Sequence, residues 1–162
     1  MPLKLIFGPA ELQRTALLIE AAAIQLKEFI ALLDREETLL VEDDSDELDA
    51  LTKEKSERFR QLQRLNDDRA LLLARGGMKH DDATMRRLFA RLPRVLARWD
   101  EVLELASQAR ERNLINGNLI AEHVRNNQAA LTALLSAANH PQLYDAGGHS
   151  RPTGGGRILG YA

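Results

Sequence analysis

The fold class follows from residues 9–40, which read PAELQRTALLIEAAAIQLKEFIALLDREETLL. Apolar or small residues recur there at steps that alternate between four and three, which is the spacing of a heptad seam on an α-helix. The seam consists of Leu12, Ala16, Ile19, Ala23, Leu26, Ile30, Leu33 and Leu40, with Glu37 as its one interruption. A second apolar stripe consists of Leu17, Ala21, Ile24, Leu32 and Leu39. A face this wide predicts a helix with two helical neighbours, as in a bundle.

A second helix is expected after the acidic turn at residues 42–47, with Asp44 or Ser45 as its N-cap. It runs to about Ala74, and Gly76-Gly77 ends it. Its seam is narrower and more polar than the first, and it reads Leu48, Leu51, Lys55, Phe59, Leu62, Leu65, Arg69, Leu72 and Leu73.

A third helical region begins near Asp81 or Asp82, either of which can cap it. Pro93 predicts a kink or a fresh start, because proline inside a helix costs about 3 kcal/mol. The four-three pattern then continues through Leu92, Leu96, Trp99, Leu103, Ala106, Arg110, Asn113, Gly117, Ile120, Val124, Asn127, Leu131, Leu134 and Ala138. Asn139-His140-Pro141 is predicted to stop this helix.

These elements predict an all-α protein, an elongated antiparallel helical bundle or coiled coil of three long helices over residues 1–140. Residues 141–162 are rich in glycine and predict a flexible C-terminal tail. An unbroken helix from Pro93 to Ala138 would be roughly 69 Å long, so either the bundle is elongated or the helix breaks near Gly117. An elongated bundle would leave apolar surface of this helix for another protein.

The composition argues against catalysis. The chain has 162 residues, no cysteine and four histidines, and none of these histidines has H-E-x-x-H or Glu-x-x-His spacing. We therefore expect no enzyme activity, no cofactor and no metal site. A net charge of -2 does not indicate a general affinity for nucleic acid or anionic membranes. Without a membrane-spanning apolar run or a signal-peptide core, we expect a cytoplasmic protein with no stable membrane insertion.

Two charged stretches have alternative interpretations. Arg87, Arg91, Arg94 and Arg98 share one helical face, which a nucleic-acid-binding bundle could use. We prefer a solvated face that is balanced by Glu101 and Glu104. The acidic cluster at residues 42–49 could be a cation site, but we prefer a capped, solvated turn, since the cluster lacks the ligand spacing of an EF-hand loop.

Residues 113–120, NLINGNLI, place polar residues and a glycine in an otherwise apolar seam. Asn113, Asn116 and Gly117 all lower helix propensity, glycine by about 1 kcal/mol relative to alanine. One interpretation is a kink or a close approach between helices. The other is an imperfect core that can rearrange around a partner helix.

With these features the sequence resembles the flagellar export chaperone family FlgN. The resemblance spans nearly the whole chain and begins with the long Leu/Ala-rich first helix. It continues with residues 69–72 before Gly76-Gly77, the Asn-x-x-Asn-Gly-x-Leu-Ile signature of residues 113–120, and Leu143-Tyr144 near Gly147-Gly148. It implies a cytoplasmic, non-enzymatic chaperone that binds the C-terminal helical segments of the hook–filament junction proteins FlgK and FlgL. Such a chaperone prevents premature assembly and aids delivery to the flagellar export apparatus.

In this view, an amphipathic partner helix lies on the seam of the last helix. The residues predicted to bind it are Ile120, Val124, Leu131, Leu134 and Leu135, with Asn113, Asn116 and Gly117 shaping the groove and Tyr144 closing its end. The alternative is a structural coiled-coil protein that forms a homo-oligomer through the same seam. A third alternative is a bundle that binds nucleic acid through the arginine face.

Overall fold

The computed structural model describes residues 7–143, with side chains to residue 137. This part of the chain contains four α-helices and no strand, namely α1 (Pro9–Glu42), α2 (Ser45–Arg75), α3 (Asp82–Leu88) and α4 (Pro93–Leu143). The predicted all-α fold with three long helices is confirmed, and α3 is a short addition. The chain divides into two compact units, Met1–Gly117 and Asn118–Ala162.

The helices begin at the predicted capping residues. Pro9 is the first residue of α1, and the backbone N–H of Gly8 donates to the Glu11 carboxylate at 2.8 Å. Asp44 caps α2 by accepting from the backbone N–H of Glu47 at 3.2 Å. These contacts satisfy backbone donors that have no partner inside the helix.

The connections after α2 also follow local chemistry. Gly77, just past the end of α2, has φ +70°, a conformation that glycine adopts without strain. Asp81 caps α3 by accepting from the backbone N–H of Thr84 at 2.8 Å. Of the two alternatives at Pro93, the structure has the fresh start, since α4 begins at this residue.

The predicted end of the last helix is wrong by a few residues. Helix α4 continues through Asn139-His140-Pro141 to Leu143, so residues 141–143 are helical and do not belong to a tail. The missing N–H of Pro141 removes one backbone hydrogen bond from the helix, which ends two residues later. The rest of the predicted tail, 144–162, lies outside the described residues.

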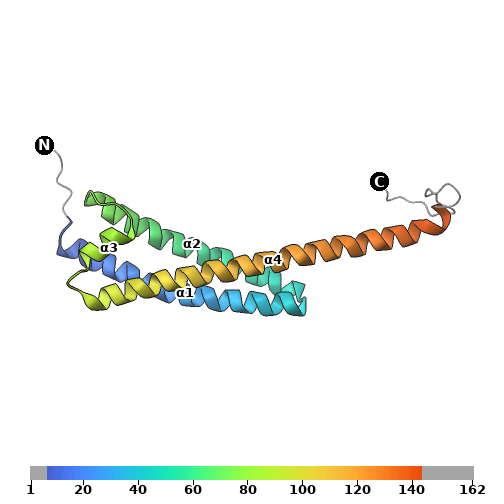
Figure 1. The fold of residues 1–162 in the computed structure, drawn as a ribbon, viewed down its shortest axis with the longest axis horizontal. Coiled ribbons are helices and arrows are strands. Elements are labelled where there is room, and N and C mark those ends of the chain that lie inside the picture. Colours follow the sequence, from blue (N-terminus) through green and yellow to red (C-terminus); the bar gives the residue numbers. More distant parts are fainter. Residues whose placement is uncertain (1–6, 144–162) are drawn as a thin grey trace. The chain divides into compact units, whose positions relative to one another are not determined.

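The core of the first unit lies between α1, α2 and the start of α4, which run side by side in Figure 1, and α3 lies at one end of them. Every one of these helices contributes buried side chains, among them Ile19, Leu33, Leu73, Met85 and Trp99. Phe89, just after α3, is also fully buried. A smaller cluster of Leu32, Leu39 and Leu51 packs near the turn between α1 and α2.

The predicted apolar face of α1 is too wide. Leu32 and Leu39 of the second stripe are buried, but Leu17 and Ile24 of the same stripe are exposed. In this half of α1 the buried face includes Thr15 and Ala22, which lie outside the predicted seam, but it does not extend to Leu17 and Ile24. Likewise Glu36, rather than Glu37, occupies the buried position in the seam.

In α4, every second residue of the predicted seam from Leu103 to Gly117 is exposed, and the residue just before it is buried instead. Trp99 is buried as expected, but Val102 and Ala109 follow it into the core and Leu103 is exposed. In a heptad pattern the core residue after Trp99 can follow three or four residues later, so the spacing allows either Val102 or Leu103 to be buried. The flank that faces α1 is the one that contains Val102 and Ala109.

We expect Leu33→Ala to lower the free energy of unfolding by about 2–5 kcal/mol, because this side chain is fully buried. The matched control is Leu17→Ala on the same helix, where Leu17 is 62% exposed and the expected change is about 0.5 kcal/mol or less. Urea unfolding followed by circular dichroism measures both. Equal losses in the two variants would contradict the placement of the core.

Candidate functional site

The most deeply buried polar side chain of α4 is Asn116, which is only 1% exposed. Its amide nitrogen donates to the backbone carbonyl of Leu33 and to Oε1 of Glu36, both at 2.9 Å. Both acceptors belong to α1. Asn116 therefore holds α4 against α1, while its own oxygen is buried without a hydrogen-bond partner.

The carboxylate of Glu36 also binds α2. Lys55 donates from Nζ to Oε1 of Glu36 at 3.0 Å and to Oε2 at 3.3 Å. A buried carboxylate is costly unless charged and hydrogen-bonding partners surround it, and here the two other helices supply them. We call Glu36, Lys55 and Asn116 the polar clasp, because it joins α1, α2 and α4 at one level of the bundle.

The predicted groove residues near the clasp lie in different environments. Asn113 and Gly117 are exposed, whereas Asn116 is buried and has no surface for direct contact with a partner. A Cβ built on Gly117 meets nothing within 4 Å, so this glycine does not serve a close approach between helices. Helix α4 is continuous through Gly117.

The second unit has no core of its own among its described side chains. Asn116 is the last buried residue, and none of residues 118–137 is buried. The predicted binding residues all lie in this stretch and are exposed, with Ile120 at 42% and Val124 at 48%. Leu131, Leu134 and Leu135 complete the set at helical spacing, so all five share one face of the helix.

A helix that exposes an apolar stripe can bind the apolar face of another protein segment. Isolated helices gain little stability in water, and most helical stability in proteins comes from packing of the apolar face. This face can be covered by the apolar face of another helix. The arrangement therefore suits protein binding. Tyr144, predicted to close the groove, lies outside the described residues.

A second polar cluster, which the sequence did not predict, joins α2 to α3 and α4. The guanidinium of Arg69 lies over the ring of Trp99 at 4.8 Å from its centroid and donates from Nε to Nε2 of His80 at 3.1 Å. The indole N–H of Trp99 donates to Asp82 at 2.7 Å. The one sequence feature that indicated this cluster was Arg69, a charged residue within the predicted seam of α2.

This environment shifts the pKa of several groups. Burial lowers the pKa of Arg69. Burial also lowers the pKa of His80, and the nearby charge of Arg69 acts in the same direction. The hydrogen bond from Trp99, followed by the one from Arg86, lowers the pKa of Asp82. A neutral His80 is what the contact requires, because its Nε2 must accept the hydrogen bond from Arg69.

The arginine face is balanced only in part, because Arg98 is the one of its four arginines that forms an ion pair with a described residue. Arg98 binds Glu20 through two hydrogen bonds and also binds Glu101. Arg86 pairs with Asp82 at 3.0 Å and with Asp100 at 2.7 Å. Glu101 plays the predicted balancing role.

Glu104, the other predicted counter-ion, accepts from Gln108 at 3.1 Å. The described residues include no group of three or more side chains that could hold a metal ion. Within the same part of the chain, no helix has the length and apolar character to cross a membrane.

Comparison with known proteins agrees with this helical architecture. The family model described as FlgN protein matches residues 11–152. The chain belongs to the FlgN family. This confirms the resemblance seen in the sequence, and because FlgN is not an enzyme family, it also confirms the prediction of a non-enzymatic protein.

Two curated relatives carry the name "Flagella synthesis protein FlgN". They come from Yersinia enterocolitica and from a strain of its serotype O:8, and each is 36% identical to this chain over 72 residues. The match covers 44% of this chain, and it spans about half the length of these FlgN relatives, 46% in each case. No solved structure matches the chain.

The polar clasp can be tested with adjacent glutamates. Glu36→Ala leaves Lys55 and the Asn116 amide without their shared acceptor, so we expect a loss of about 1–3 kcal/mol in the free energy of unfolding. Glu37→Ala is the matched control, because Glu37 is exposed, and its expected effect is about 0.5 kcal/mol or less. Denaturant unfolding that ranks the two variants equally would contradict the clasp.

The contact between His80 and Arg69 makes stability depend on pH. Because the pKa of His80 is lowered in the folded state, the unfolded chain binds a proton more readily. Stability should therefore fall as pH drops through the ordinary histidine pKa of about 6.5. We expect His80→Gln to show a smaller fall in melting temperature between about pH 8 and about pH 5. Identical pH profiles for parent and variant would exclude this role.

Proposed function

We propose that this chain acts in flagellar assembly as an export chaperone. We further propose that residues 118–137 hold the C-terminal helical segments of the hook–filament junction proteins FlgK and FlgL. The observation that carries the proposal is the exposed apolar stripe of these residues, in a stretch with no buried side chain. Membership of the FlgN family and relatives named for flagella synthesis support the flagellar context.

The chemistry of the stripe supports binding of a helix. Full burial of one aliphatic side chain stabilises a complex by about 1.5–3 kcal/mol, before the cost of ordering both partners. Asn127 lies on the same face, between Val124 and Leu131. A polar residue within an apolar seam can select one register of the bound helix.

A chaperone role follows from the same contact. A partner segment that covers the stripe is itself covered, so it cannot pair with other subunits before export. Asn113, Asn116, Gly117 and Tyr144 remain predicted contributors to the groove, although Asn116 is buried in the first unit. Delivery to the export apparatus in the cytoplasm completes the proposed role.

The double substitution Ile120→Asp with Val124→Asp tests the binding face. We expect affinity for purified FlgK or FlgL to fall at least about 100-fold in isothermal titration calorimetry, because two apolar contacts are replaced by charges. Because both side chains are partly exposed, circular dichroism should show the parent's helix content. Unfolding of the variant would place these residues in a core and contradict the proposal.

The matched control is Asn118→Asp with Ala129→Asp, which adds the same charge on the opposite side of the helix. This variant should bind like the parent. FlgK and FlgL that lack their C-terminal segments should bind neither protein. Full binding by these truncated partners would overturn the proposal, and permanent self-association without any FlgK or FlgL binding would favour the structural coiled-coil alternative.

A further inference from the structure

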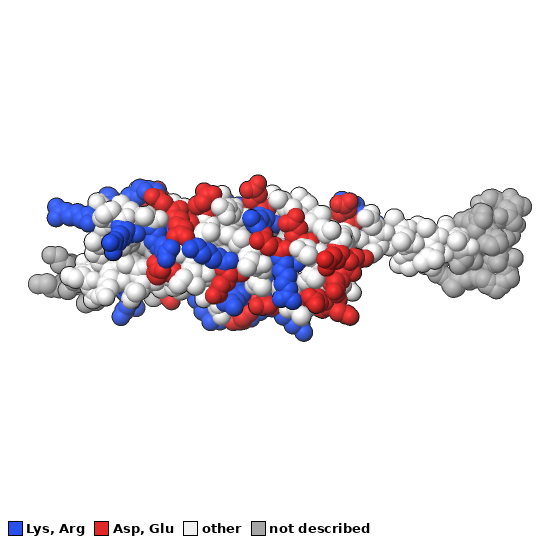
Figure 2. All heavy atoms as spheres, turned by 90° about the horizontal axis from the view of Figure 1, so that it is seen from below, with Lys and Arg blue, Asp and Glu red and all other residues white. Residues whose placement is uncertain are grey.

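The first unit carries opposite charge at its two ends. Six of the eight residues 42–49 are Asp or Glu, and they form the turn between α1 and α2 and the first turn of α2. Residues 75–98 contain seven Lys or Arg and only two Asp or Glu. Figure 2 shows blue side chains gathered toward the end where α3 lies and red ones gathered at the opposite end of the unit.

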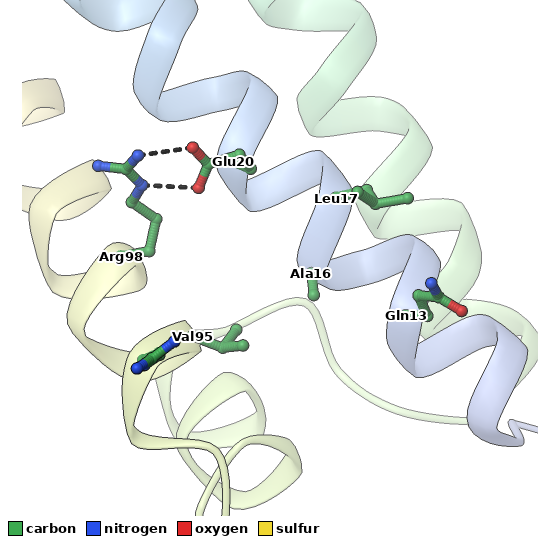
Figure 3. A pocket seen from close by; sticks show the side chains of 7 residues that line it. Gln13, Ala16, Leu17, Glu20, Val95 and Arg98 are labelled. Carbon is green, nitrogen blue, oxygen red and sulfur yellow. Dashed lines mark hydrogen bonds and ion pairs between the residues drawn. The ribbon is translucent and has the colours of Figure 1, made fainter.

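The basic end contains a groove between α1 and α4. Its volume is about 290 Å³, and its apolar surface comes from Ala16, Leu17 and Val95. Arg94 lies at its rim. In Figure 3, the ion pair between Glu20 and Arg98 spans the space between the two helices, with hydrogen bonds of 2.5 and 2.7 Å. The groove is short and can take one or two apolar side chains.

Arg94 lines this groove, and Arg91 lies three residues before it in the sequence. Arg91 and Arg94 are exposed and form no ion pair with any described residue, in contrast to Arg86 and Arg98. The surface is therefore an apolar groove with basic side chains at its edge. Charge complementarity calls for an occupant that is apolar at its centre and acidic around it.

The α1–α2 turn of this same chain has that chemistry. Val41 is 73% exposed and directly precedes the acidic residues 42–49. Glu42 and Asp49 are exposed and form no ion pair with any described residue. We call Val41 with residues 42–49 the acidic tip.

We propose that the acidic tip of one copy docks into the basic groove of a second copy, head to tail. Within one molecule the two surfaces cannot meet, because Glu20 and Glu42 lie on the same continuous helix and are separated by roughly 33 Å along its axis. The contact joins two different surfaces, so it leaves a free tip and a free groove and builds open chains. It uses none of residues 118–137 and is independent of the proposed partner site.

Because the groove is small and its charges are exposed, the contact between two copies is weak. Exposed ion pairs contribute little individually and are screened by salt, so the association is weak and transient. Its salt dependence separates it from association through the apolar stripe of residues 118–137. Burial of apolar surface persists or strengthens at high salt, whereas the head-to-tail contact disappears.

Sedimentation of the full-length chain over a wide concentration range tests the proposal. We expect chains of growing length at about 0.01 M salt and monomers at about 1 M salt, where the Debye length is only about 3 Å. Arg91→Glu with Arg94→Glu disables the groove, and Glu42→Lys with Asp49→Lys disables the tip. Each double variant alone should self-associate at least about tenfold more weakly than the parent.

Mixing the two variants provides the deciding result. The intact tip of the groove variant meets the intact groove of the tip variant, so association should return in the mixture. Arg64→Glu with Arg110→Glu changes two exposed arginines elsewhere by the same total charge and should associate like the parent. Monomers at every concentration in low salt, or a mixture that stays dissociated, would overturn the proposal.

Discussion

The carboxylate of Glu36 is the contact on which the arrangement of the three long helices depends. It is buried in α1, and it accepts from Lys55 on α2 and from Asn116 on α4. Apolar seams alone permit helices to slide by a heptad with little loss, because one leucine contact resembles another. A buried carboxylate permits no such displacement, since a shifted helix would leave it without its donors. The polar clasp thus selects one register, at the cost of a buried Asn116 oxygen without a partner.

The clasp also marks where burial ends along α4. Asn116 is the last buried residue, yet the apolar periodicity continues through Ile120, Val124 and Leu131. The first unit is therefore a folded bundle, whereas in the second unit no described residue covers the apolar face of the helix. For a protein of the FlgN family, this division is physically useful. The buried side chains of the described residues lie between Thr15 and Asn116, so residues 118–137 can keep an apolar surface without endangering the fold.

Two kinds of surface coexist on this chain and respond differently to solution conditions. The stripe of residues 118–137 is apolar and suits a helix of another protein, whereas the basic groove and acidic tip depend on charge. Salt weakens the second kind of contact and spares the first. The cluster of Arg69, His80 and Trp99 adds a response to acid, because the lowered pKa of His80 links its neutral form to the folded state.

Local chemistry in the sequence determined the helices and most of their ends. Gly8-Pro9, Asp44, Asp81 and Gly76-Gly77 act over three or four residues, so their effects can be read without a tertiary structure. Only packing decided which flank of each seam is buried. Heptad spacing from Trp99 allows either Leu103 and Gly117 or Val102 and Asn116 to face the core. The first pair is the more apolar and was predicted, but the second pair is buried. A periodic pattern specifies the buried face of a helix only to within about one residue. The position of α1 therefore decides which residues of α4 are buried, and the positions of α2 and α4 decide that Glu36 is buried and Glu37 is exposed.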